Sequence, residues 1–183
     1  MRQTIYYLPG HGGQIGAGLG KALLERGFDV VGRETLGAFK ALSFGEQVDI
    51  VADDLKTDYW REDAMVIANS FGGYLFLSAQ SQLSSYVGRV ILLSPIVGEF
   101  ANETTMMNFI PARAEQLRSK VNLGDFPRPR DCQVHVGAQD WQSNPKDVSE
   151  FGRLTGIPVH IVEGSGHMLD RGYVSDLLDA WLL

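Results

Sequence analysis

Ser70 stands where a serine hydroxyl could act as a nucleophile. It follows Ala64–Ala68, a short apolar run typical of a buried strand, and precedes Gly72–Leu77, a strongly apolar segment with helical character. A serine on a sharp turn between a strand and a helix holds its hydroxyl above the sheet, beside the partial positive charge of the helix N-terminus. Such a turn brings backbones close together and needs small residues two positions either side, which Ala68 and Gly72 supply. The plainer alternative is that Ser70 only caps the helix.

The same five-residue pattern occurs twice, so the pattern alone does not select Ser70. Ala41–Gly45 matches Ala68–Gly72 in four of five positions. Ser43, however, follows no strand, and Glu46 stands three residues later, which is the spacing of a capping box at the start of a helix. We therefore predict that Ser43 is structural and that Ser70 is the candidate nucleophile.

A serine hydroxyl becomes an effective nucleophile only when a base removes its proton, and histidine is the most frequent base. Of the four histidines, His135 and His160 lie inside strand patterns and are expected to be core or sheet-face residues. His11 and His167 both follow strands. His167 lies on the loop Glu163–Met168 after the last strand, where two glycines let the loop reach across the sheet edge. His167 is therefore the candidate base.

The base needs a carboxylate to orient it. Asp140 comes soon after the strand pattern Gln133–Val136 and is the candidate acid. Glu99, which follows the strand pattern Arg89–Leu93, is the reserve. Cys132 precedes its strand, so it is expected at the opposite edge of the sheet, away from this chemistry.

Residues 9–21 join the first strand pattern to a helix and contain six glycines. Such a loop suggests nucleotide binding, but a dinucleotide fingerprint counted from Gly10 needs glycine where Ile15 stands. A P-loop ending at Lys21 needs serine or threonine where Ala22 stands. What remains is a loop that can direct free backbone N–H groups at a negative charge.

Short apolar runs alternate with helical patterns along the chain. This alternation predicts a doubly wound α/β domain, with an about six-stranded, mostly parallel sheet and helices on both faces. A length of 183 residues leaves room for one domain, 1–183. The interval 98–131 is longer than a simple crossover connection needs, and it contains the apolar segment Met106–Pro111. It is either a surface helix with its connection or a small flap over a pocket. The expected strands are Thr4–Leu8, Phe28–Val31, Ala64–Ala68, Arg89–Leu93, Gln133–Val136 and Pro158–Val162.

Composition narrows the class of function. The net charge of −6 argues against a nucleic-acid backbone as the main partner. The single cysteine excludes an internal disulfide and any multi-cysteine zinc site. No run approaches the roughly 20 apolar residues of a membrane span, and no targeting signal is visible, so a cytoplasmic protein is expected.

Four of these features are predicted just beyond the carboxyl ends of four strands. They are the loop His11–Gly13, Ser70, Asp140 and His167. In an open parallel sheet, this edge is where ligands bind. The candidate nucleophile, acid and base are therefore expected to meet at one edge of the sheet.

The motifs around these residues resemble those of the α/β-hydrolase superfamily. Ala68–Gly72, Gly137–Asp140 and Gly164–His167 supply serine, aspartate and histidine in the order of that superfamily. The resemblance extends over essentially the whole chain and is to compact, capless, esterase-like serine hydrolases. Ala68 replaces the commoner glycine, and the superfamily's first antiparallel hairpin is missing. The implied sheet has six parallel strands with the first strand central.

The resemblance implies a role for each matching residue. Ser70 would be the nucleophile, His167 the general base and then acid, and Asp140 the group that orients His167. The oxyanion hole would consist of the backbone N–H groups of Phe71 and Gly13. No metal or organic cofactor is implied.

The predicted function is cleavage of an ester-like bond, in a carboxylester or a thioester, through an acyl-enzyme on Ser70. A small-molecule acyl substrate is the partner this implies, and the oligomeric state stays open. The alternatives are an amide or aminoacyl hydrolase and a non-catalytic binding module with an idle triad. The residues expected to line the substrate pocket, of which His11 would also brace its loop, are His11, Trp141, Met168, Met107 and Phe109.

Overall fold

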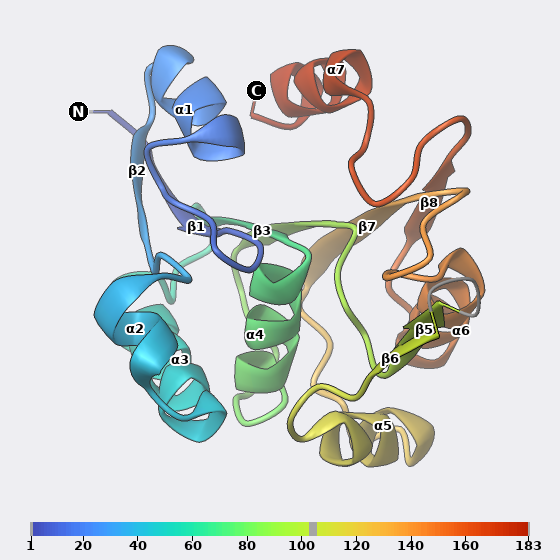
Figure 1. Cartoon of the computed structure of the whole chain (residues 1–183). Helices are drawn as coiled ribbons and strands as arrows, with labels where there is room; N and C mark the ends of the chain where they lie inside the picture. Colours follow the sequence, from blue (N-terminus) through green and yellow to red (C-terminus); the bar gives the residue numbers. More distant parts are fainter. Residues whose placement is uncertain (1, 103–105, 183) are drawn as a thin grey trace.

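A sheet of six parallel strands forms the centre of the protein (Figure 1). The structure is a computed structural model that describes residues 2–102 and 106–182. The strand order is β2-β1-β3-β4-β7-β8. All six predicted strands are present, which confirms the predicted fold class. Their bounds are β1 Thr4–Leu8, β2 Asp29–Gly32, β3 Met65–Asn69, β4 Arg89–Leu93, β7 Asp131–Gly137 and β8 Val159–Val162.

The chain reverses its direction of winding between β1 and β3. After β1 it adds β2 on one side, then returns to place β3 on the other side. The expectation that the first strand is central needs correction, because β1 lies second from one edge and β3 and β4 occupy the middle. The crevice at such a reversal is the usual ligand site of an open α/β sheet.

Helices cover both faces of the sheet. Helices α1 (Gly18–Glu25) and α7 (Arg171–Trp181) pack on one face, and the others lie on the opposite side (Figure 1). None of the helices in the described ranges combines the length and apolar character that crossing a membrane requires. The remaining helices are α2 Gly37–Ala41, α3 Phe44–Asp58, α4 Phe71–Gln80, α5 Ala114–Asn122 and α6 Pro145–Thr155.

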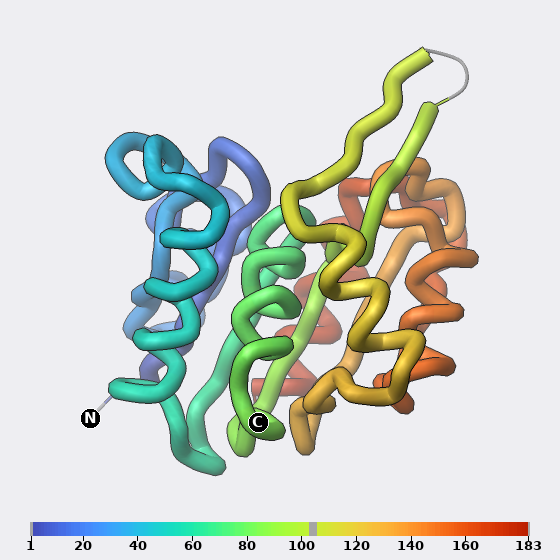
Figure 2. Tube along the Cα trace, turned by 90° about the horizontal axis from the view of Figure 1, so that it is seen from below, coloured from blue at the N-terminus to red at the C-terminus, as the bar shows by residue number. Residues whose placement is uncertain are grey.

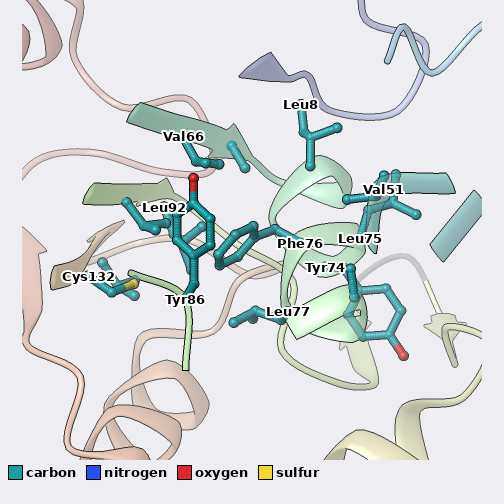
Figure 3. Packing of buried hydrophobic residues seen from close by; sticks show 14 of the residues in the cluster. Leu8, Val51, Val66, Tyr74, Leu75, Phe76, Leu77, Tyr86, Leu92 and Cys132 are labelled. Carbon is teal, nitrogen blue, oxygen red and sulfur yellow. The ribbon is translucent and has the colours of Figure 1, made fainter. Parts of the chain in front are cut away.

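Helix α4 is the most deeply buried helix, and it begins directly after Ser70. Every residue from Gly72 to Gln80 is buried. Side chains such as Leu75 and Phe76 pack among residues of the strands and of α3 (Figure 3). A helix that is apolar on all sides has to be enclosed, which is why this segment has almost no amphipathic pattern. The nucleophile turn is therefore anchored at the core of the molecule.

The interval 98–131 contains a two-stranded antiparallel hairpin followed by α5. The hairpin consists of β5 (Phe100–Asn102) and β6 (Met107–Phe109) and projects beyond the body of the molecule (Figure 2). Residues 103–105 of the predicted flap lie outside the described residues. The hairpin was not foreseen, because three-residue strands carry too little alternation to be recognised in a sequence.

His135 is a buried histidine on β7, as its position in a strand pattern predicted. Its side chain is hydrogen-bonded through Nδ1 to the hydroxyl of Tyr173 on α7, at 2.7 Å, and its ring stacks on His160 of β8 at 4.6 Å. Burial, reinforced by the neighbouring His160, lowers the pKa of His135 to about 4. The folded protein therefore holds His135 neutral, whereas an unfolded chain would protonate it below about pH 6.5.

Acid conditions are expected to destabilise the protein through His135. Between about pH 6.5 and 4, His135 binds a proton in the unfolded state but not in the folded state. The free energy of unfolding therefore falls as the pH decreases through that window. Between pH 7 and pH 5 this contribution is about 2 kcal/mol. The free energy of unfolding is measured in urea titrations at both pH values. Between pH 7 and pH 5, its decrease in His135→Gln should be about 2 kcal/mol smaller than in the wild type. His160→Gln, which leaves His135 in place, is the control. It should lose nearly as much stability as the wild type, because burial is the larger cause of the lowered pKa of His135. An equal loss in all three proteins would refute the assignment.

Candidate active site

Ser70 occupies a strained turn between β3 and α4. Its backbone has φ 51° and ψ −119°, a region that side chains rarely adopt. The turn is held by a hydrogen bond from the Ser70 N–H to Leu93 O, at 3.0 Å. A side chain on Gly72 would collide with the carbonyl oxygen of Leu8, and Ala68 is fully buried. At Gly72 the need for a small residue therefore follows from the close approach of backbones, as predicted.

Ser43 plays the structural role predicted for the second copy of the motif. It caps α3 by accepting a hydrogen bond from the Glu46 N–H at 3.3 Å. The Glu46 carboxylate in turn accepts from the Ser43 N–H at 2.8 Å, which completes the capping box. The two serines thus share a sequence pattern but differ in backbone conformation, since Ser43 has φ −61°.

The structure brings Ser70, His167 and Asp140 into one hydrogen-bonded chain. Ser70 Oγ lies 2.8 Å from His167 Nε2. On the far side of the imidazole, His167 Nδ1 lies 3.0 Å from Asp140 Oδ1 and 2.9 Å from Oδ2. This is the geometry in which an imidazole can take a proton from the serine while a carboxylate stabilises the resulting cation.

Asp140 is enclosed and its carboxylate is held from several directions. Its side chain is fully buried. Oδ1 accepts hydrogen bonds from the backbone N–H groups of Gln142 and Ser143, both at 2.9 Å. Backbone donors to a buried carboxylate offset the loss of its hydration. The carboxylate is therefore fixed in position before any substrate binds.

The acid loop (residues 138–144) carries Asp140, the histidine loop (residues 163–170) carries His167, and the two are joined to each other. The Gln139 N–H donates to Ser165 O at 2.9 Å. A Cβ atom on Gly137 would collide with the carbonyl oxygens of Ser165 and Gly166, so only glycine permits this approach. The glycine pattern before Asp140 thus serves the contact with the histidine loop.

The prediction that the Gly13 N–H is a free oxyanion donor is wrong. Gly12 has φ 73° and turns the loop so that the Gly13 N–H donates to Gly10 O and to Thr35 Oγ1, each at 2.9 Å. The Thr35 hydroxyl in turn donates to Gly10 O. Thr35 is 22 residues away in sequence, and no local signal at Gly13 indicates that it takes up this N–H.

Gly10 is the residue of this loop that lies against the nucleophile. A Cβ atom on Gly10 would lie 3.2 Å from Ser70 Cβ and 3.7 Å from Ser70 Oγ. Among the described residues, neither the N–H of His11, which follows Gly10, nor that of Phe71 has an acceptor in the protein. Both free N–H groups therefore belong to residues next in sequence to the contact between Gly10 and Ser70: His11 follows Gly10, and Phe71 follows Ser70.

The predicted pocket residues are spread over the same edge of the sheet. The His11 ring contacts Phe71 edge-on at 5.7 Å. Trp141 contacts Phe100 of the hairpin at 5.7 Å, and Phe100 contacts Phe109 at 5.1 Å. Sequence reasoning missed Phe100, which joins the acid loop to the hairpin. Met107 and Met168 are 50% and 83% exposed and are not drawn into an enclosed pocket.

The other candidate residues lie away from the chain of hydrogen bonds. Glu99 forms an exposed ion pair with Arg118 at 2.9 Å. Cys132 is buried near the opposite edge, and burial raises the pKa of its thiol, which disfavours the reactive thiolate. Within residues 2–102 and 106–182, no group of three or more histidine, cysteine or acidic side chains is placed to hold a metal ion.

Comparison with known structures identifies the fold. No family model matches the sequence, and no curated protein resembles it in sequence. The solved structures are more informative: the ydeN gene product of B. subtilis is similar with a TM-score of 0.67 at 14% identity, and 98% of each chain is covered. MGS-MChE2, an α/β hydrolase enzyme from a lagoon-sediment metagenome, matches with a TM-score of 0.66 at 15% identity, covering 100% of this chain and 91% of its own.

A third similar structure is the monoacylglycerol lipase of Paleococcus ferrophilus, with a TM-score of 0.68 at 12% identity, covering 98% of this chain and 93% of its own. These matches extend over nearly the whole of both chains. The protein therefore has the α/β-hydrolase fold, as the resemblance of its motifs predicted.

Proposed function

We propose that the protein is a serine hydrolase that cleaves an ester-like bond, in a carboxylester or a thioester, through an acyl-enzyme on Ser70. The observation that carries this proposal is the hydrogen-bonded chain from Ser70 through His167 to the buried Asp140. The α/β-hydrolase fold supports it, because the chain of residues lies at the sheet edge where this fold binds ligands.

The reaction follows from the order of Ser70, His167 and Asp140 in this hydrogen-bonded chain. Ser70 Oγ attacks the acyl carbon while its proton passes to His167 Nε2, and Asp140 stabilises the imidazolium that forms. When the tetrahedral intermediate collapses, the bond to the leaving group breaks and that group takes the proton from His167. Water then attacks the acyl carbon of the acyl-enzyme while His167 removes a proton from the water. The bond between the acyl carbon and Ser70 Oγ breaks, Oγ takes the proton from His167, and the free acid leaves as product.

The negative oxygen of the tetrahedral intermediate needs two donors beside Ser70. We assign these to the backbone N–H groups of Phe71 and His11, since Gly13 is already hydrogen-bonded within its loop. The Phe71 N–H belongs to the first turn of α4, where the helix dipole favours a negative charge. Each such donor is typically worth about 3 to 4 kcal/mol of transition-state stabilisation.

The acyl group is proposed to lie along the aromatic side chains between the acid loop and the hairpin. Trp141 directly follows Asp140, and its ring continues through Phe100 to Phe109. This strip is apolar, and we propose that it takes a slender acyl chain. In this arrangement 98–131 is a flap on a single domain. Met107 and Met168 are exposed at the rim of the proposed substrate site, and His11 lies on the Phe71 side of the nucleophile.

A fluorophosphonate probe tests the proposal without knowledge of the natural substrate. Only a serine activated by a base reacts with it at an appreciable rate. The wild-type protein is expected to be labelled once, on the peptide that contains Ser70, as measured by mass spectrometry. Ser70→Ala should remain unlabelled.

Ser43→Ala is the matched control, because it removes the serine of the second copy of the motif. It should be labelled like the wild type. An unlabelled wild-type protein, or labelling that persists in Ser70→Ala, would show that Ser70 is not an activated nucleophile. A panel of p-nitrophenyl esters of increasing chain length then measures the preference for slender acyl groups.

A further inference from the structure

Ser143 is a buried serine whose role no sequence motif indicates. It is 1% exposed. Its N–H donates to Asp140 Oδ1 at 2.9 Å, and its hydroxyl donates to Pro95 O at 2.5 Å. One residue therefore contacts both the candidate acid and a segment that follows β4. Most buried hydroxyls make a hydrogen bond, and the one that the Ser143 hydroxyl makes is to Pro95 O.

The segment Ser94–Ile96 is in turn fixed against the nucleophile. The Ile96 N–H donates to Ser70 O at 3.2 Å. Pro95 packs on α4, where a Cβ atom on Gly73 would lie 2.7 Å from Pro95 Cβ. Ser94 has φ 44°, a strained conformation that directs the chain over the start of α4. Pro95 O is thus held in a defined position relative to Ser70.

The acid loop is held differently on its other side. Its backbone joins the histidine loop through the Gln139 N–H and β8 through the Ala138 N–H, which donates to Val162 O at 3.0 Å. These bonds position Asp140 relative to His167. On the side of the nucleophile, the backbone bond nearest the acid loop joins the Ser94 N–H to His135 O of β7, at 2.7 Å. Among the described hydrogen bonds, that of the Ser143 hydroxyl is the side-chain bond that joins the acid loop to the segment beside Ser70.

We propose that Ser143 is a positioning residue for the reaction: its hydroxyl fixes the acid loop to Pro95, and so sets Asp140 and His167 at the distance from Ser70 that proton transfer requires. This inference rests on the proposed function. Ser143 does not touch the reacting atoms and acts through Asp140 and Pro95.

Loss of the Ser143 hydroxyl should impair the chemical step and spare substrate binding. In Ser143→Ala the backbone N–H still reaches Asp140, but Pro95 O is left without its partner and the acid loop is free to shift. A displacement of about 1 Å in a catalytic group can lower a rate by about 100-fold. We expect kcat for a p-nitrophenyl ester to fall by about tenfold to 100-fold with KM unchanged.

The pH dependence of the reaction distinguishes positioning from a general loss of structure. Asp140 is the charged group in contact with His167, and a displaced carboxylate stabilises the imidazolium less. The acidic limb of the fluorophosphonate labelling rate should therefore move to lower pH in Ser143→Ala. Ser143→Cys keeps a weak donor of similar size and should restore part of the rate. A purely structural serine would change the yield of folded protein without moving this limb.

Ser78→Ala is the matched control, because Ser78 is also a buried serine, 6% exposed, and stands about two turns along α4 from its start at Phe71. It should leave kcat, KM and the labelling profile unchanged. Wild-type kinetics and an unshifted pH profile in folded Ser143→Ala would overturn the inference. That result differs from failure of the proposed function, in which the wild-type protein itself is neither labelled nor active.

Discussion

Replacing Ser70 with alanine is expected to lower the turnover of an activated ester by about 10⁵-fold, because the attacking oxygen is removed while the rest of the site remains. The residual rate would come from the oxyanion donors and from substrate binding. In a Ser-His-Asp set, loss of the serine or of the histidine alone costs about as much as the loss of all three. His167→Ala should therefore match Ser70→Ala, and the double variant should be no slower than either single one.

The same position allows a test of strain that is independent of activity. Ser70 has φ 51°, and a residue with a Cβ pays about 1 to 3 kcal/mol for a sparsely populated backbone conformation. Glycine adopts positive φ without that cost. Ser70→Gly should be inactive, yet more stable than Ser70→Ala by about 1 kcal/mol in urea unfolding.

Two results would contradict this account of Ser70. Turnover in purified Ser70→Ala within about tenfold of the wild type would mean that another group forms the acyl-enzyme. Equal stability of the alanine and glycine variants would mean that the turn holds no strain. Ser43→Gly is the matched comparison, since Ser43 has φ −61° and makes both capping bonds. Its replacement by glycine should lower stability, because the hydroxyl that caps α3 is lost.

The sheet and the catalytic order were predictable from the sequence because both depend on local patterns. Parallel strands buried on both faces need continuous apolar runs, and β1 and β4 have the predicted bounds. Ser70, Asp140 and His167 each lie beyond the carboxyl end of a strand. The parallel arrangement therefore brings three residues that are far apart in sequence to one edge.

The features that sequence reasoning missed depend on partners far away in the chain. The sequence around Gly13 is consistent with a free donor, but in the structure its N–H donates to the hydroxyl of Thr35. Ser143 has no motif, and its role depends on where Pro95 lies. A hydrogen bond between distant residues, or the position of one loop against another, leaves no repeating pattern in the sequence. Such contacts can therefore be found only in the three-dimensional structure.

Replacing Gly72 is expected to damage both the fold and the turn that carries the nucleophile. A Cβ atom at this position would collide with the main-chain oxygens of Leu8 and Pro9, and backbone atoms cannot move aside as a flexible side chain can. Overpacking of a tight core usually costs about 1 to 3 kcal/mol and sometimes more. We expect Gly72→Ala to lose about 3 kcal/mol or more of unfolding free energy. The displacement of α4 from β1 should also move Ser70 and remove fluorophosphonate labelling in whatever protein folds.

Two other glycines provide a graded comparison. At Gly73, the next residue of α4, a Cβ atom would lie 2.7 Å from Pro95 Cβ, so alanine should be tolerated better than at Gly72. At Gly16 nothing lies within 4 Å, and alanine should be neutral or stabilising by up to about 1 kcal/mol because it restricts the unfolded chain. Urea unfolding of the three variants should rank them Gly16→Ala, Gly73→Ala and Gly72→Ala in decreasing stability. Equal stability of Gly72→Ala and Gly16→Ala would mean that alanine fits between α4 and β1. The close contact between these two elements could then not be what fixes the nucleophile turn.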